Sequence, residues 1–253
     1  MKSRSFLHQV DNPLNPSFPR YNDEKTGFAY RLTLKNQIGS FMKPFAYKGI
    51  ILASQSPRRK VLLEKMNIPF HMIASRIREL PPMGERPNAY SARLALEKAM
   101  DVAEFYPDHL VIGADTVVAI QDTIMGKPSS KNEAIIMLSR LSGNWHEVWT
   151  GICLYHKQSS TQKLRAVCSE VRFRNLSEEE IIQYVETGEP MDKAGAYAIQ
   201  EKGKSLVREL KGSYHNVIGL PTMELGKMLQ DLGVSIDSKP IEMPYDFGTF
   251  SEN

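Results

Sequence analysis

The hydrophobic residues of this chain fall into short apolar runs that alternate with stretches of helical periodicity. The apolar and β-branched runs predict strands, and the stretches with apolar residues three and four positions apart predict amphipathic helices. The predicted strands lie near 50–53, 70–74, 110–120, 147–155 and 164–174. The predicted helices lie near 57–66, 88–105, 130–140, 177–187 and 221–232. This alternating order favours an α/β fold over an all-α or all-β one.

The first predicted strand leads into a helix whose start is suited to an anion. Residues 53–59 read ASQSPRR, in which Ser56 is placed to be the N-cap and Pro57 to be the first helical residue. The free N–H groups and the dipole of a helix start favour negative charge, and Arg58 and Arg59 add planar donors that match phosphate oxygens. The alternative is an ordinary capped surface helix with two solvated arginines.

A carboxylate interrupts the most apolar predicted strand. Residues 113–116 read GADT within the run 110–120. A buried Asp115 must be paired, hydrogen-bonded or bound to a metal, and the small residues before it leave room for a ligand. Lys127, held in a turn between a glycine and a proline, supplies a further positive charge. The alternatives are a strand end that turns into solvent and a solvated lysine.

These segments, in this order, resemble the Maf family of nucleotide pyrophosphatases. The resemblance extends from about Gly49 to about Leu232. It rests on ASQSPRR at 53–59, GADT at 113–116, GKP at 126–128, LSG at 141–143, LSEEEI at 176–181 and EPMDKAGAYAIQ at 189–200. It implies an α/β fold with a mixed, bent sheet and flanking helices in two lobes, similar to inosine-triphosphate pyrophosphatases. The nucleotide is expected in the cleft between the lobes, and the protein is expected to be a homodimer.

The implied reaction is hydrolysis of a nucleoside triphosphate to the monophosphate and pyrophosphate, with Mg²⁺ or Mn²⁺ as cofactor. By motif position, Asp115 corresponds to the proton acceptor, and Glu79 and Lys98 to an acidic and a basic residue of the same cleft. Glu79 could hold the metal together with Asp115, because magnesium prefers oxygen ligands. Most family members carry two acidic residues where this chain has Arg78 and Glu79. The implied substrate-binding residues are Ser54, Arg58, Arg59, Lys98, Thr116, Lys127 and Gln200. For Lys98, spacing alone favours an ordinary lysine at the border of an amphipathic helix, and only the resemblance assigns it to the site.

Three of these residues resemble the dTTP/UTP subgroup of the family: Arg58, Thr116 and Gln200. A glutamine amide offers both a donor and an acceptor to a pyrimidine edge, and a threonine hydroxyl can adapt to either. The implied substrates are therefore dTTP and UTP, with 5-modified pyrimidine triphosphates as further candidates, and the implied role is to clear or sanitise nucleotides.

Two other classes of function are weighed against this one. A non-catalytic nucleotide-binding regulator of cell division stays open as the alternative, although it would not need Asp115, Glu79 and Lys127 beside two arginines. A nucleic-acid binder is disfavoured because the net charge is only +3 and the aromatic residues do not interleave with the basic ones. No nucleic-acid partner is therefore expected.

Composition agrees with an enzyme in a reducing compartment. The chain has 253 residues, of which 42% are hydrophobic, enough for a full core. Cys153 and Cys168 lie on separate predicted strands without metal-ligand spacing and are expected to be free thiols. No apolar run approaches the roughly 18 residues of a membrane span, and the first residues lack the apolar stretch of a signal peptide. A cytoplasmic protein without a membrane partner is expected.

Three segments are expected along the chain. Residues 1–47 match nothing in the family and are expected to be a flexible extension or to precede the true start, since Met42 lies just before the family-like region. Residues 48–234 are expected to form the nucleotide pyrophosphatase domain. Residues 235–253 are expected to be a flexible tail.

Overall fold

The computed structural model describes residues 47–234, which form an α/β fold around one mixed sheet. The predictions for the segments before residue 47 and after residue 234 lie outside the described residues. The sheet has seven strands in the order β2-β1-β3-β5-β6-β7, and β4 also pairs with β3. The strands are β1 (Ile50–Leu52), β2 (His71–Met72), β3 (Leu110–Ile120), β4 (Thr123–Met125), β5 (Trp145–His156), β6 (Thr161–Phe173) and β7 (Val207–Lys211). β1 pairs in parallel with β2 and β3, and the other pairs are antiparallel.

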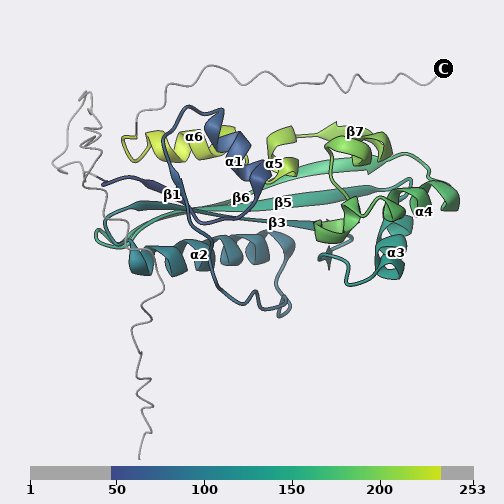
Figure 1. Ribbon diagram of the computed structural model, residues 1–253, viewed down its shortest axis with the longest axis horizontal. Helices are drawn as coiled ribbons and strands as arrows, with labels where there is room; N and C mark the ends of the chain where they lie inside the picture. Colours follow the sequence, from purple (N-terminus) through teal and green to yellow (C-terminus); the bar gives the residue numbers. More distant parts are fainter. Residues whose placement is uncertain (1–46, 235–253) are drawn as a thin grey trace, which may run out of the picture.

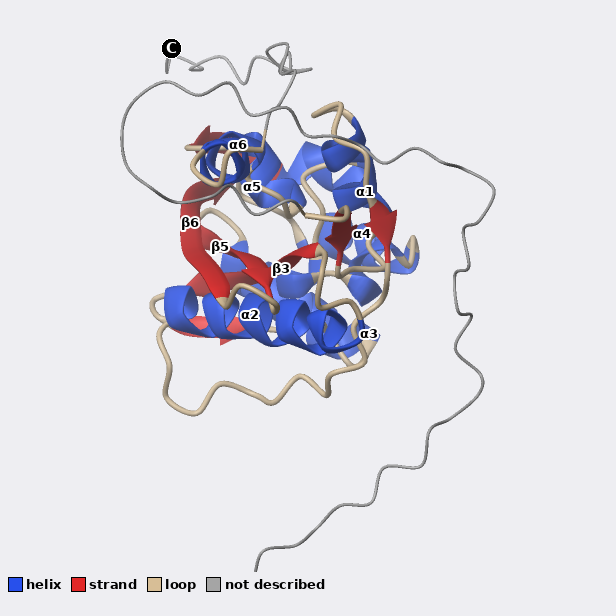
Figure 2. Cartoon of the chain, turned by 90° about the vertical axis from the view of Figure 1, so that its left-hand side faces the viewer, coloured by secondary structure: helices blue, strands red, loops and turns tan. Residues whose placement is uncertain are grey.

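Helices cover both faces of the sheet. The α-helices are α1 (Pro57–Glu64), α2 (Pro87–Phe105), α3 (Lys131–Leu141), α4 (Glu178–Glu186), α5 (Tyr214–Ile218) and α6 (Thr222–Gln230). Three 3₁₀ helices follow α4, namely η1 (Glu189–Asp192), η2 (Ala194–Ala196) and η3 (Glu201–Leu206). In Figure 1, α2 runs along one face of the sheet, and α1, α5 and α6 lie on the other. Figure 2 shows the same layers from the side.

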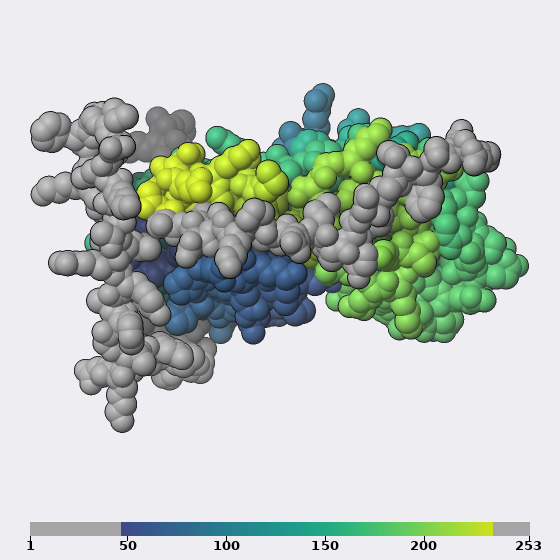
Figure 3. Space-filling model, turned by 90° about the horizontal axis from the view of Figure 1, so that it is seen from above, coloured from purple at the N-terminus to yellow at the C-terminus, as the bar shows by residue number. Residues whose placement is uncertain are grey.

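The other elements gather at the two ends of β3, which confirms the predicted two lobes. β1, β2, α1 and α6 lie at one end, and β4, α3, α4 and β7 lie at the other (Figure 1). Figure 3 views the molecule from above, with the blue region of α1 and the yellow α6 in one half and green segments in the other. The main hydrophobic core runs through both halves, from Leu63 on α1 to Leu138 on α3.

Two glycines bring α2 close to the sheet. A Cβ atom on Gly113 of β3 would lie 2.0 Å from the carbonyl oxygen of Ala95, and one on Gly151 of β5 would lie 2.2 Å from that of Ser91. No side chain fits in either place, so the helix backbone rests directly on the two strands. This close approach brings Lys98, on the same helix, over the middle of β3.

One edge of β3 is open in its middle. β1 pairs with residues 110–112 and β4 with residues 118–120, whereas β5 pairs along nearly the whole opposite edge. Within the described part of the chain, residues 113–117 therefore have no strand beside them on that edge. Because successive residues of a strand point to opposite faces, Asp115 faces α2 and Thr116 faces α5. We call this gap, residues 113–117, the β3 opening.

Candidate active site

A cluster of three charged side chains lies at the β3 opening. Asp115 is only 7% exposed, and Lys98 Nζ donates to its Oδ1 at 2.5 Å. The same ammonium group lies 2.7 Å from Glu79 Oε1, in the loop between β2 and α2. One lysine therefore bridges two carboxylates that come from different elements. The sequence assigned these three residues to one site only through the family resemblance, and the structure brings them into contact.

The two carboxylates of this cluster differ in their tendency to hold a proton. Burial raises the pKa of Asp115, against the opposing positive charges of Lys98 and Arg59. Burial also acts to raise the pKa of Glu79, but the hydrogen bond and charge of Lys98, with Lys127 and Arg59, hold that pKa below its usual value. Glu79 is thus kept ionised, whereas Asp115 is the better proton acceptor. A pair of acidic groups with separated pKa values is typical of acid–base chemistry.

Arg59 ties together the other side of the β3 opening. Its Nη1 donates to Ser54 Oγ at 3.3 Å, its Nη2 to Thr116 Oγ1 at 3.1 Å, and its Nε to the carbonyl oxygen of Gly219 at 2.8 Å. The helix start that carries it is capped as predicted, because Ser56 Oγ accepts a hydrogen bond from the backbone N–H of Arg59. A planar guanidinium is needed to reach three acceptors in different directions.

Thr116 is part of a second line of hydrogen bonds that runs into the interior. Its Oγ1 lies 2.9 Å from Thr150 Oγ1 on β5, and Thr150 Oγ1 donates to the carbonyl oxygen of Asn216 at 2.9 Å. Thr150 and Asn216 are both fully buried. Sequence reasoning missed these two residues, since one threonine in a strand and one asparagine near a turn carry no signal of a shared site.

The remaining predicted site residues are Lys127, Arg58 and Gln200. Lys127 is exposed just after β4, yet its charge contributes to the lowered pKa of Glu79. Arg58 is partly buried on α1, and its charge contributes to the lowered pKa of Asp192 on η1. Gln200 lies between η2 and η3, and no hydrogen bond among residues 47–234 joins it to the Asp115 cluster. The structure therefore brings Lys127 within electrostatic range of the cluster and shows no direct hydrogen bond from Gln200 to it among the described residues.

Glu79 and Asp115 are the carboxylates that could hold a divalent cation. In the described chain, no group of three or more His, Cys, Asp and Glu side chains is arranged to hold a metal. Mg²⁺ is commonly held by one or two carboxylates together with substrate phosphates and water, so two converging carboxylates fit such an ion. The chemistry of this donor set suits a metal that arrives with a phosphate substrate.

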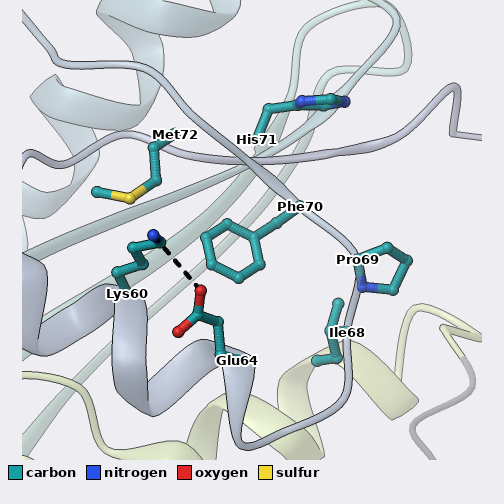
Figure 4. A pocket seen from close by; sticks show the side chains of 7 residues that line it. All are labelled: Lys60, Glu64, Ile68, Pro69, Phe70, His71 and Met72. Carbon is teal, nitrogen blue, oxygen red and sulfur yellow. Dashed lines mark ion pairs between the residues drawn. The ribbon is translucent and has the colours of Figure 1, made fainter.

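A separate pocket lies on the outer side of α1. Its volume is about 490 Å³, and its lining residues are Lys60, Glu64, Ile68, Pro69, Phe70, His71 and Met72 (Figure 4). Lys60 and Glu64 form an exposed ion pair of 3.6 Å across it. This pocket shares no residue with the cluster around Asp115, and its paired charges offer a polyphosphate little attraction. The β3 opening is therefore the candidate active site.

Cys153 and Cys168 are free thiols, as predicted. Of the helices in residues 47–234, none combines the length and the apolar character needed to cross a lipid bilayer.

Known proteins resemble this chain over most of its length. Residues 49–232 match the model of the family described as Maf-like protein. The chain is 47% identical over 181 residues to a dTTP/UTP pyrophosphatase of Clostridioides difficile, covering 72% of this chain and 93% of that protein. It is 44% identical over 197 residues to the protein of the same name from Acetivibrio thermocellus, covering 75% and 98%. A Bacillus cereus protein of that name is 44% identical over 189 residues, again covering 75% and 98%. The chain therefore belongs to the Maf family.

Proposed function

We propose that this protein hydrolyses dTTP and UTP to the nucleoside monophosphate and pyrophosphate. The observation that carries the proposal is the buried carboxylate of Asp115, which lies at the β3 opening with a raised pKa and an ammonium group bound to one oxygen. The relatives that are 44–47% identical to this chain over the aligned residues are named for the same activity.

The geometry supports a direct role for Asp115 in activating water. A water oxygen attacks the α-phosphorus, the bond from that phosphorus to the bridging oxygen breaks, and pyrophosphate leaves with the electron pair. Lys98 donates to Asp115 Oδ1, and the carboxylate keeps further lone pairs with which to take the proton of the water. Lys98 also fixes the direction of this carboxylate, because it is bound at the same time to Glu79.

Positive side chains around the β3 opening would hold the triphosphate. Arg59 and Arg58 at the start of α1, with Lys127 after β4, are the cations proposed to bind the β- and γ-phosphates. Glu79 and Asp115 would hold Mg²⁺ or Mn²⁺. When bound, such an ion neutralises phosphate charge and lowers the pKa of a coordinated water.

The choice of base is proposed to depend on Arg58, Thr116 and Gln200. Thr116 is supported by its position at the β3 opening, next to Asp115 and in contact with Arg59. Gln200 is supported by the family pattern alone. The proposed substrates include 5-modified pyrimidine triphosphates, and the proposed role is to clear or sanitise nucleotides. We further propose a cytoplasmic homodimer with no nucleic-acid partner, for which light scattering of the purified protein should give twice the mass of one chain.

A panel of nucleotides tests this function. Pyrophosphate release would be measured with Mg²⁺ and with Mn²⁺ for dTTP, UTP, dCTP, CTP and the purine triphosphates. Selective release from dTTP and UTP is expected. Comparable release from all of them would contradict the proposed specificity. Nucleotide binding without any release would contradict the enzyme and favour a non-catalytic regulator.

A further inference from the structure

Three hydrogen bonds in series connect the active site with the interior of the sheet. They run from Arg59 Nη2 to Thr116 Oγ1 (3.1 Å), from Thr116 Oγ1 to Thr150 Oγ1 (2.9 Å), and from Thr150 Oγ1 to the carbonyl oxygen of Asn216 (2.9 Å). We call these four residues the hydroxyl relay. Thr116 and Thr150 are direct cross-strand partners on β3 and β5, so the sheet register itself holds their hydroxyls together.

The direction of the relay is fixed from both ends. A guanidinium can only donate, so Thr116 Oγ1 accepts from Arg59. A backbone carbonyl can only accept, so Thr150 gives its single hydroxyl hydrogen to Asn216. Thr150 has no second hydrogen, and the contact between the two threonines therefore has Thr116 as the donor. The hydrogen of Thr116 points away from the β3 opening, into the sheet.

The far end of the relay is held rigidly. The side-chain amide of Asn216 donates to the carbonyl oxygen of Val148 at 2.9 Å and to Ser169 Oγ at 3.0 Å. Its backbone N–H donates at 3.2 Å to the Oγ of Ser213, which is the N-cap of α5. These bonds tie Asn216 to β5, β6 and the start of α5. The carbonyl group that receives the hydrogen of Thr150 therefore has no freedom to turn away.

We infer that Thr150 is a positioning residue for base selection. Its Oγ1 accepts the only hydroxyl hydrogen of Thr116, so Thr116 Oγ1 can only accept a hydrogen bond from a base. Thymine and uracil carry an N–H group at position 3, whereas cytosine carries an acceptor nitrogen there. A Thr116 that can only accept favours the first two and rejects the third. This inference rests on the proposed function, in which the choice of base depends on Thr116.

The decisive variant is Thr150→Val, which keeps the shape of the side chain and removes its hydroxyl. The hydroxyl hydrogen of Thr116 is then free to turn toward a base, so kcat/KM for dCTP should rise relative to that for dTTP. The ratio of kcat/KM for dTTP over dCTP should fall on the order of tenfold, the value of about one hydrogen bond. Thr150→Ser is the matched control and should keep the original ratio, since it retains the relay. A folded Thr150→Val protein with an unchanged ratio would overturn the inference.

A second set of variants distinguishes a purely structural role of Thr150 from a role that acts through Thr116. In Thr116→Val, the hydroxyl that Thr150 orients is absent, so adding Thr150→Val should change the ratio no further. A further fall of similar size would show that Thr150 does not act through Thr116, and would overturn the inference. Thermal unfolding of each variant reports lost stability separately from lost selectivity.

Two more measurements keep the test decisive if variants do not fold or turnover is absent. The unaltered protein is compared on UTP and 3-deaza-UTP, which has C–H in place of N3–H. A loss on the order of tenfold is expected for the analogue, and equal use would contradict the inference. Binding of the α,β-methylene analogues of dTTP and dCTP, which cannot be cleaved, is measured in parallel. A preference for dTTP in binding without any hydrolysis would overturn the proposed function and support the relay, whereas equal binding would overturn the relay.

Discussion

The two faces of β3 at its opening carry different kinds of chemistry, although their key residues are neighbours in the sequence. On the face toward α2, Asp115 belongs to a cluster of full charges with Lys98 and Glu79. On the face toward α5, Thr116 belongs to the hydroxyl relay, in which the guanidinium of Arg59 is the only charged group. The alternation of side chains along one strand is enough to separate the two sets.

The difference shows how one strand can serve two requirements of a hydrolase. The charged face has a carboxylate whose pKa is raised by burial, as proton transfer requires. The relay face has donors and acceptors whose directions do not depend on pH near neutrality, as recognition of a base requires. Changes on the first face should therefore alter rate and pH dependence, and changes on the second should alter affinity and selectivity.

The largest expected effect is on the charged face. Asp115→Asn keeps the size of the side chain but removes the proton acceptor, so kcat should fall on the order of 10³-fold while nucleotide binding and folding persist. Pyrophosphate release, nucleotide affinity and thermal unfolding would be measured together. Asp122→Asn, in the exposed turn between β3 and β4, is the matched control and should retain full activity. Turnover by the Asp115 variant at the level of this control would remove Asp115 from the mechanism.

The next prediction concerns the positive charge on the same face. Lys98→Met removes the ammonium group that holds down the pKa of Asp115, so this pKa should rise further above the usual aspartate value. Asp115 acts as a carboxylate, hence the acidic limb of the kcat/KM profile should move to higher pH. Activity at pH 7 should fall on the order of 10²-fold. Lys131→Met removes an exposed lysine paired with Glu186 and should leave the limb in place. A limb that stays or moves to lower pH in the Lys98 variant would contradict this assignment.

A third prediction concerns the contact that positions the charged face. Gly151→Ala would force a methyl group against the carbonyl oxygen of Ser91 and push α2 away from the sheet. The free energy of unfolding should fall by about 3 kcal/mol, which denaturant titration can measure. Gly126→Ala is the matched control, because a Cβ atom there meets open space. Equal stability of the two variants would show that α2 does not depend on this close approach.

The smallest expected effect is on the relay face. Arg59→Lys keeps the positive charge but cannot bind Ser54, Thr116 and Gly219 at once. KM for dTTP should rise on the order of tenfold. The pH dependence of kcat should change less than in the Lys98 variant. Arg140→Lys, exposed on α3, serves as the control in the same steady-state assay. A shift of the acidic limb without any change in KM would show that Arg59 works with the charged face instead.

Local signals in the sequence predicted much of the fold. The N-cap at Ser56 is present, and the long runs near 110–120, 147–155 and 164–174 are strands. The predicted strand near 70–74 is confirmed only over His71–Met72. The unpredicted elements are short: β4, β7, α5 and the three 3₁₀ helices. Segments of three to six residues carry too little periodicity to be recognised, and β4 and β7 exist through pairing with β3 and β6.

The site was predictable in part, for a similar reason. The buried aspartate and the basic helix start are local features, and the sequence indicated both. The opening of β3 is not local, because it depends on where two other strands stop along one edge. Arg59 and Gly219 meet across 160 residues, and only the folded chain shows that contact. The role of Lys98 needed the family resemblance, because its spacing on α2 is also that of an ordinary surface lysine.

The most direct test of the central claim is to find where the oxygen of water enters the products. The protein is incubated with dTTP in ¹⁸O-labelled water, and dTMP and pyrophosphate are analysed by mass spectrometry. Attack at the α-phosphorus, assisted by Asp115, predicts one ¹⁸O atom in dTMP and none in pyrophosphate. Label in pyrophosphate, or release of dTDP and phosphate, would contradict the proposed reaction at the β3 opening.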